Sequence, residues 1–167
     1  LKRRFKQYKI DDQDLAKLKM RMDIIPVSIA LAQAANESGW GTSRFALEGN
    51  ALFGQWTWSN KGILPANKDP DKSHKVMQFQ ILKASVRAYK NNLNTHNAYK
   101  EFREARAKLR EEGETIIGLK LTKYLKNYAS IGEKYVIILD DIIERNVLTD
   151  FDKADLLTTK SQRGVAL

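Results

Sequence analysis

The sequence predicts a mainly helical α+β domain in which one small β-rich insertion interrupts the helices. Apolar residues recur at helical spacing through most of the 167 residues. All three tryptophans and two of the three prolines instead fall between residues 39 and 79, where this spacing is lost. The chain contains no cysteine, which excludes a disulfide scaffold, a thiolate metal site and a cysteine nucleophile.

Two helices are expected before the insertion. Asp11 or Asp12 is a suitable cap for the first, which continues to about Met22. The second spans residues 24–38 and ends at Gly39, because glycine readily adopts the left-handed conformation of a helix C-cap. It is apolar around most of its circumference, as in a central buried helix. The stripe expected to be buried consists of Val27, Leu31, Ala34 and Ala35.

The insertion, at about residues 53–80, is expected to form a small β-lobe. Aromatic and turn residues between Trp56 and Leu64 are typical of a short hairpin. Residues 65–71 are rich in proline, asparagine and aspartate and are expected to form a loop. Residues 76–79 suit a short strand.

Helical spacing resumes after the insertion. Its apolar stripes run through residues 82–93, 102–109 and 117–128. Ser130 and Glu133 stand three residues apart and match a capping box, which predicts a last helix to about Asn146. We therefore expect a single domain over residues 1–148, followed by a polar tail over 149–167.

Positive charge is concentrated in two segments of a chain whose formal net charge is +9. Residues 1–22 hold eight basic and three acidic residues, and residues 80–110 hold eight basic and two acidic residues. Such segments favour a polyanionic partner, either nucleic acid or an anionic wall or membrane surface, unless they are merely solvated helix faces. No apolar run approaches the roughly 18 residues of a membrane span, so we expect no integral membrane segment.

One acid stands at the end of the expected central helix. Glu37 is the only acidic residue between Asp23 and Glu48. The negative end of the helix dipole and apolar surroundings both favour a protonated carboxyl group. A carboxylic acid held in that form can act as a general acid. From its position alone, Glu37 is equally consistent with a solvated side chain.

The residues around Glu37 belong to two motifs with a known counterpart. Residues 32–43 carry Ala-Gln-Ala-x-x-Glu-Ser-x-Trp-Gly-x-Ser, and residues 50–54 carry Asn-Ala-Leu-Phe-Gly. Together they resemble the bacterial glucosaminidases of glycoside hydrolase family 73, which include the wall-cleaving domain of the flagellar rod hydrolase. Phe-Gly-Gln-Trp at 53–56, with Asn-Leu-Asn-Thr-His and Ala-Tyr within 92–99, is most similar to the Bax-type branch. The resemblance covers about residues 20–148.

This resemblance implies a lysozyme-like fold, with a helical lobe and a small β-lobe flanking a substrate groove. It also implies hydrolysis of the β-1,4 bond between N-acetylglucosamine and N-acetylmuramic acid in peptidoglycan, without a cofactor or metal. Glu37 falls on the general acid of the family. Tyr128, in a Tyr-Ala pair, falls on a tyrosine that lines the groove, and Tyr135 falls near a second one. The implied location is periplasmic or extracellular, and we expect a monomer.

The second catalytic group is open at this point. Glycoside hydrolases normally use two carboxylates, and Asp69 and Asp71 are the only acids between Glu48 and Glu101. Both are also explained as turn residues of an Asp-Pro-Asp sequence. The 2-acetamido group of the substrate is an alternative nucleophile. Retention and inversion of configuration therefore both stay possible.

Aromatic and amide side chains near the motifs are candidates for sugar binding, because sugar rings stack on aromatic faces. The candidates for substrate binding are Asn50, Phe53, Gln55, Trp56, Trp58 and Tyr135. Trp40 and Phe53 are also expected to pack beneath the groove, Asn50 to brace its loop and Tyr135 to belong to the core. Three other functions stay open: an inactive wall-binding module, a lytic transglycosylase of the same fold, and a basic nucleic-acid binder. The glucosaminidase motifs favour peptidoglycan over nucleic acid as the partner.

Overall fold

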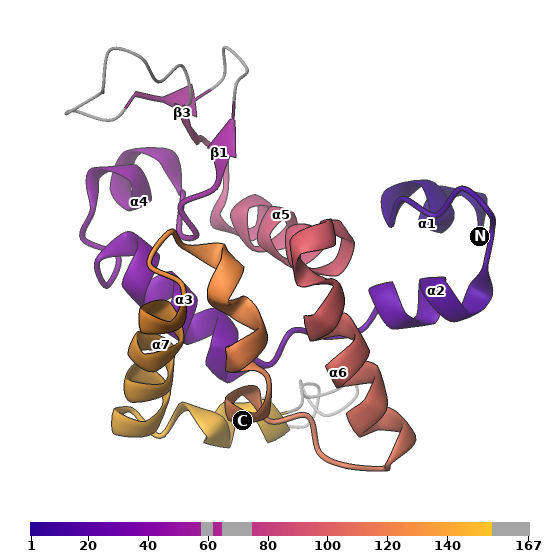
Figure 1. Ribbon diagram of the computed structural model, residues 1–167. Coiled ribbons are helices and arrows are strands. Elements are labelled where there is room, and N and C mark those ends of the chain that lie inside the picture. Colours follow the sequence, from indigo (N-terminus) through magenta and orange to yellow (C-terminus); the bar gives the residue numbers. More distant parts are fainter. Residues whose placement is uncertain (58–61, 65–74, 155–167) are drawn as a thin grey trace, which may run out of the picture.

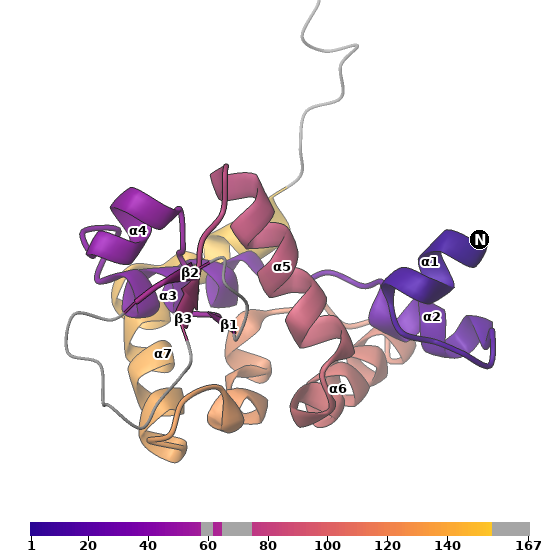
Figure 2. The same cartoon turned by 90° about the horizontal axis from the view of Figure 1, so that it is seen from above.

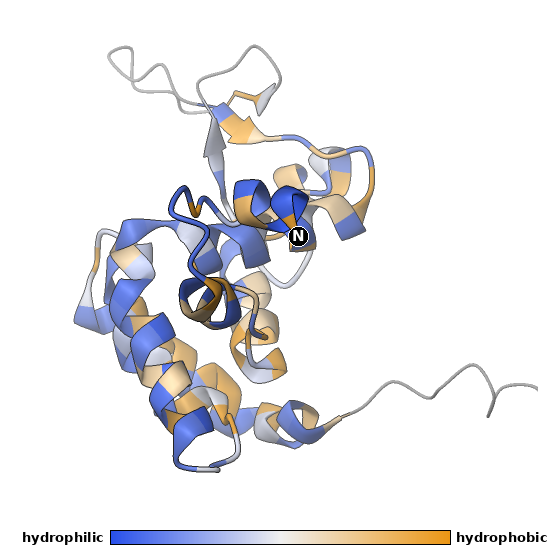
Figure 3. Cartoon of the chain, turned by 90° about the vertical axis from the view of Figure 1, so that its right-hand side faces the viewer, coloured by the Kyte–Doolittle hydropathy of each residue, from blue (hydrophilic) through white to orange (hydrophobic). Residues whose placement is uncertain are grey.

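The computed structural model describes residues 1–57, 62–64 and 75–154. It confirms the fold class: the described chain is mainly helical, with one small antiparallel sheet (Figure 1). Its α-helices are α1 (Lys2–Gln7), α2 (Leu15–Arg21), α3 (Val27–Ser38), α4 (Arg44–Gly49), α5 (Leu82–Thr95), α6 (Lys100–Glu111) and α7 (Glu133–Arg145). Its short 3-10 helices are η1 (Asn97–Tyr99), η2 (Gly118–Lys120), η3 (Thr122–Tyr128) and η4 (Leu148–Lys153). Figure 3 shows that hydrophilic and hydrophobic residues alternate along the helices of the body.

The central helix α3 forms as expected, but it buries a different face. Val27 and Leu31 are exposed, whereas Ile29 and Ala32 are buried in the main core. The predicted stripe was wrong for Val27 and Leu31, although Ala34 packs against the core. Because α3 is apolar on most sides, hydrophobicity alone does not choose its inner face. Polar side chains decide it: Gln33 on α3 is fully buried and hydrogen-bonded to tyrosines of α5 and α7.

Helix ends are partly as expected. Gly39 is the left-handed C-cap of α3, as predicted. Helix α2 is capped by Asp14 instead of Asp11 or Asp12, because the Asp14 carboxylate accepts from two backbone N–H groups of the first turn. The predicted capping box before α7 is absent: the N-cap is Gly132, which makes no side-chain hydrogen bond.

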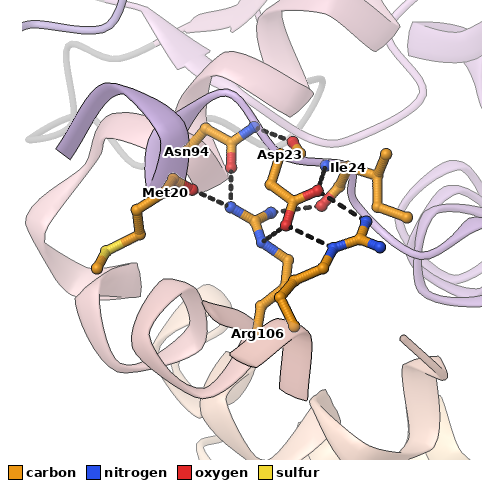
Figure 4. A network of polar contacts seen from close by, with 6 residues as sticks. Met20, Asp23, Ile24, Asn94 and Arg106 are labelled. Carbon is orange, nitrogen blue, oxygen red and sulfur yellow. Dashed lines mark hydrogen bonds and ion pairs between the residues drawn. The ribbon is translucent and has the colours of Figure 1, made fainter. Parts of the chain in front are cut away.

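Two of the basic residues in segment 80–110, Arg103 and Arg106, are buried, and Arg106 holds the N-terminal segment in place. Arg106 on α6 donates to the backbone carbonyls of Met20 and Ile24 and to the Asn94 side chain (Figure 4). Burial lowers the pKa of its guanidinium to about 10. Arg103 is also buried and donates to the carbonyls at the end of α5. The positive charge of residues 80–110 is therefore not a single exposed face.

The β-lobe projects from the helical body beside α4 (Figure 1). Its strands are β1 (Trp56–Thr57), β2 (Gly62–Ile63) and β3 (Lys75–Met77), in the spatial order β1-β3-β2. The expected hairpin between Trp56 and Leu64 was wrong, because β1 and β2 do not pair with each other. Each pairs with β3 in antiparallel register, so that the buried Val76 faces both Trp56 and Ile63.

The first residues assigned to the polar tail contribute to the helical body. Helix η4 packs on α3, and the Asp152 carboxylate accepts hydrogen bonds from the backbone and hydroxyl of Ser28 and from the backbone of Gly118. Residues beyond Ala154 lie outside the described part of the chain. None of the helices in the described ranges is long and apolar enough to span a membrane.

Candidate active site

A cavity of about 540 Å³ opens between the end of α3, the root of the β-lobe and the chain leading into α7. It brings together five of the predicted site residues, which are far apart in sequence. These are Glu37, Phe53, Gln55, Trp56 and Tyr128. Met77, Asn92 and Tyr99 also line the cavity and were not singled out as site residues from the sequence. Asn92 and Tyr99 lie within segment 92–99, whose similarity to the Bax-type branch could have identified them as site residues.

Glu37 occupies the last turn of α3, where the helix meets the cavity. Its Oε1 atom accepts a hydrogen bond of 2.8 Å from the Tyr135 hydroxyl and one of 3.2 Å from the Asn36 amide. The side chain is half-buried, so one carboxylate oxygen is fixed by the protein while the carboxyl group still reaches the cavity. Among the described residues that line the cavity, Glu37 is the single acid.

Gly54 is fitted to this carboxylate. Its φ of +58° lies in the left-handed region that favours glycine. A Cβ atom at this position would lie 2.9 Å from the Glu37 Oε2 atom, which is closer than carbon and oxygen pack. The Leu-Phe-Gly motif therefore ends on the one residue type that allows the chain to pass directly against the acid.

A chain of buried hydrogen bonds leads from the core to Glu37. The Tyr89 hydroxyl donates to the Gln33 Oε1 atom, and the Gln33 Nε2 atom donates to the Tyr135 oxygen. Each of these hydrogen bonds is 2.8 Å long. Because that oxygen accepts from Gln33, the Tyr135 proton is directed at Glu37. Gln33 thus sets the direction of the final hydrogen bond. It stands in the Ala-Gln-Ala part of the motif but was not singled out from the sequence.

Tyr135 is a buried support for the acid. Its side chain has 0% exposure, which matches the expectation that it belongs to the core. In this structure it therefore reaches Glu37 from behind the cavity wall and does not face a bound sugar. Burial, followed by the negative charge of Glu37, raises the pKa of Tyr135 far above its usual value, so the phenol stays a neutral donor.

Tyr128 lines the cavity and is held on three sides. Its ring stacks on Tyr135 with 5.6 Å between centroids and packs against Tyr99 at 6.0 Å. Its hydroxyl donates to the Phe53 carbonyl over 2.9 Å. Burial and then the charge of Glu37 raise the pKa of Tyr128 well above its usual value. The oxygen of this neutral phenol can still accept a hydrogen bond.

The aromatic candidates divide between the floor and the rim of the cavity. Phe53 is buried and stacks on Tyr89 with centroids 3.9 Å apart, so it packs beneath the cavity as expected. Trp40 is 65% exposed, and the expectation that it packs beneath the groove was wrong. Its backbone has a φ of +57°, so Trp40 follows Gly39 in the left-handed region. Trp56 is 58% exposed at the cavity wall, where a sugar ring can stack on it.

The amide candidates have different roles. Asn50 is the left-handed C-cap of α4 and donates to the Phe79 carbonyl over 3.0 Å, so it braces the loop. Gln55 lines the cavity, and its buried Oε1 atom has no hydrogen-bond partner in the described chain. Trp58, Asp69 and Asp71 lie outside the described residues. Within the described ranges, no group of three histidine, aspartate or glutamate side chains is arranged to hold a metal ion.

Comparison with known proteins assigns the chain to a sequence family. Residues 13–148 match the glucosaminidase family, which is described as mannosyl-glycoprotein endo-β-N-acetylglucosaminidase. The chain is 41% identical over 115 residues to a protein of Escherichia coli (strain K12) named protein bax. This match covers 69% of the chain but 40% of the length of the bax protein. No solved structure matches the chain.

Proposed function

The chain belongs to the glucosaminidase family, and on this premise we propose that it is a peptidoglycan hydrolase. Specifically, we propose an endo-β-N-acetylglucosaminidase that cleaves the β-1,4 bond between N-acetylglucosamine and N-acetylmuramic acid. The observation that carries this proposal is the carboxyl group of Glu37, held by Tyr135 at the edge of a cavity of about 540 Å³ with an exposed tryptophan in its wall.

Glu37 is the proposed general acid. Cleavage of a glycosidic bond requires a proton on the leaving oxygen as the bond to the anomeric carbon breaks. Tyr135 engages the Oε1 atom, and the Oε2 atom lies beside Gly54. A fixed carboxyl group favours catalysis because the orientation of the proton is set before the substrate arrives.

The second catalytic function falls to a carboxylate of the loop or to the substrate. In the first case, Asp69 or Asp71 activates water or attacks the anomeric carbon. In the second case, the 2-acetamido oxygen attacks that carbon, and Tyr128 is well placed to orient the acetamido group through its phenol oxygen. Replacing Asp69 and Asp71 together with asparagine separates these cases: activity is lost in the first and retained in the second.

The enzyme is further proposed to act in the cell envelope, periplasmic or extracellular, as a monomer with peptidoglycan strands as its partner. Residues 1–148 are proposed as one catalytic domain. Helix η4 is attached to this domain by hydrogen bonds from Ser28 and Gly118 to the Asp152 carboxylate. No cofactor enters the proposed reaction, since proton transfer and attack at the anomeric carbon need only protein and substrate groups.

A single substitution tests the proposal. Glu37→Gln keeps the shape of the side chain and removes the acid, so release of reducing sugar from purified sacculi falls to background. Glu48→Gln is the matched control, because Glu48 is exposed on α4 and does not line the cavity. A Glu37→Gln protein that still lyses sacculi contradicts the proposal. A wild-type protein that binds sacculi without cleaving them is instead an inactive wall-binding module.

A further inference from the structure

Helix α5 separates the candidate active site from a second cavity. Asn92 on α5 lines the cavity that contains Glu37. The preceding residues, Lys90 and Asn91, line a cleft of about 570 Å³ between α5 and the N-terminal helix α1. The active-site cavity and this α1–α5 cleft therefore lie on two sides of one helix.

The α1–α5 cleft is strongly basic. Arg3 and Arg4 enter it from α1, and Arg87 and Lys90 enter it from α5. The other lining residues are Gln7, Tyr8 and Asn91, so the described walls contain no acid. Neither α1 nor α5 contains an acidic residue in its sequence.

Some surface cations elsewhere on the described chain are paired within their own helices or with a neighbouring segment, whereas others, such as Lys2, Lys19 and Lys83, form no ion pair with a described residue. Lys100 and Lys108 on α6 and Arg145 on α7 each face an acid four residues along the chain. Lys126 pairs with Glu133. The α1–α5 cleft gathers four cations without an acid: Arg3, Arg87 and Lys90 form no ion pair with any described residue, and Arg4 donates to Gln7 alone. The cleft therefore gathers cations that are available to an external anion.

The protein holds these cations together although like charges repel. Helix α1 is fixed by a small apolar cluster, which consists of Phe5, Tyr8, Ile10 and Leu18. Arg21 on α2 also donates to the carbonyls of Tyr8 and Lys9, and α2 is tied to the body by Arg106 (Figure 2 shows α1 and α2 together beside α5 and α6). A fixed cluster of unpaired like charges opposes stability, and such conflicts typically mark a binding site.

We propose that the α1–α5 cleft binds carboxylates of the peptide stems that branch from the glycan strand, an inference that rests on the proposed function. A helix is about 10–12 Å across. A stem of four or five residues spans about 13–18 Å when extended, so a stem attached to a sugar in the active-site cavity reaches past α5. Arginine pairs with carboxylates through two parallel hydrogen bonds, and three of the four cations are arginines.

The walls of the cleft favour a peptide over other polyanions. Its one aromatic residue, Tyr8, is buried, so no exposed ring is offered for the base stacking of single-stranded nucleic acid. No aliphatic side chain lines the cleft, whereas attachment to a lipid surface depends on apolar residues as well as on charge. Polar groups such as Gln7 and Asn91 suit the amide backbone of a peptide.

Two variants of equal charge test this site. The cleft variant carries Arg3→Gln, Arg4→Gln, Arg87→Gln and Lys90→Gln. The control variant carries Lys100→Gln, Lys108→Gln, Lys126→Gln and Arg145→Gln, which removes four paired cations and lowers the net charge of +9 by the same four units. Both are made with Glu37→Gln, so that binding is measured without digestion. Sedimentation measures binding to intact sacculi and to glycan strands from which an amidase has removed the peptides.

The expected result is a loss of about tenfold or more in affinity of the cleft variant for intact sacculi, against about twofold for the control. On peptide-free strands the two variants bind equally. Equal losses on intact sacculi would overturn the proposal, since they would indicate general charge attraction. A larger loss on an oligonucleotide or on phosphatidylglycerol vesicles than on sacculi would also overturn it. Sugar release by the wild-type protein is measured separately, so failure of the proposed reaction is distinguishable from failure of the stem site.

Discussion

The two cavities beside α5 differ in how their charged groups are satisfied. In the active-site cavity, Glu37 accepts two hydrogen bonds, one of them from a tyrosine that is itself fixed by Gln33. In the α1–α5 cleft, cations such as Arg87 have no acid nearby. The first arrangement orients one group for a reaction, whereas the second leaves several groups open to a ligand. The basic residues of 80–110 differ in the same way: Arg106 is buried and satisfied by the protein, whereas Arg87 is exposed.

The largest expected effect concerns the buried arginine. Arg106→Leu leaves the carbonyls of Met20 and Ile24 and the side chain of Asn94 without their donor, and Asp23 loses a neighbouring cation. We expect a loss of about 3–5 kcal/mol in the free energy of unfolding, measured by urea denaturation. Lys108→Leu, at a position about half a helix turn away on an exposed face, should change it by less than about 0.5 kcal/mol. Equal effects would show that the two cations are equivalent.

The next prediction compares two glycines with positive φ, of which only Gly54 lies against Glu37. Gly54→Ala places a Cβ against the Glu37 carboxylate, so kcat should fall about 100-fold as the acid is displaced. Gly113→Ala is the matched control, because Gly113 also has a positive φ (+70°) but an added Cβ meets nothing within 4 Å. Both should lose about 1 kcal/mol of stability. An active Gly54→Ala enzyme would contradict the close fit around Glu37.

A smaller effect tests the hydrogen-bond chain to the acid. Tyr135→Phe removes the donor to Glu37 and should lower kcat/KM about tenfold. Tyr124→Phe, which removes the hydroxyl of a partly buried ring packed against the core, should leave kcat/KM unchanged. An unaltered kcat/KM in Tyr135→Phe would reduce Tyr135 to a packing residue.

The smallest effect concerns stability in the cleft. The four-residue cleft variant should melt slightly higher than the wild type at low salt, because repulsion between α1 and α5 is relieved. The four-residue control should melt slightly lower, since it loses ion pairs such as Lys100–Glu104. Both differences should shrink in 1 M salt. A cleft variant that melts lower than the control would show that these cations stabilise the fold.

Much of the site was predictable because it is local in sequence. Glu37, Gly39 and the 50–54 motif follow one another within a short stretch, and helix periodicity places Glu37 and Gly39 at the end of α3. The helical spacing of Tyr135 predicted its place in the core but not its hydrogen bond to Glu37. The two residues are 98 positions apart in sequence. Contacts of that separation depend on packing, which periodicity does not encode.

The missed features share this dependence on tertiary structure. The inner face of α3 is set by Gln33 and Ser28, whose partners come from α5, α7 and η4. The order of the β-lobe strands depends on the burial of Val76 between its neighbours. The basic composition of residues 80–110 could not distinguish the buried Arg106 from the exposed Arg87, because both are charged residues at helical spacing.

The most direct test of the central claim is mass spectrometry of the muropeptides released from sacculi by the wild-type protein and by Glu37→Gln. Glucosaminidase activity with Glu37 as the acid predicts products with N-acetylglucosamine at the reducing end, and none from Glu37→Gln. Products ending in 1,6-anhydro-N-acetylmuramic acid would contradict it and identify a lytic transglycosylase. The same products from both proteins would remove Glu37 from the reaction.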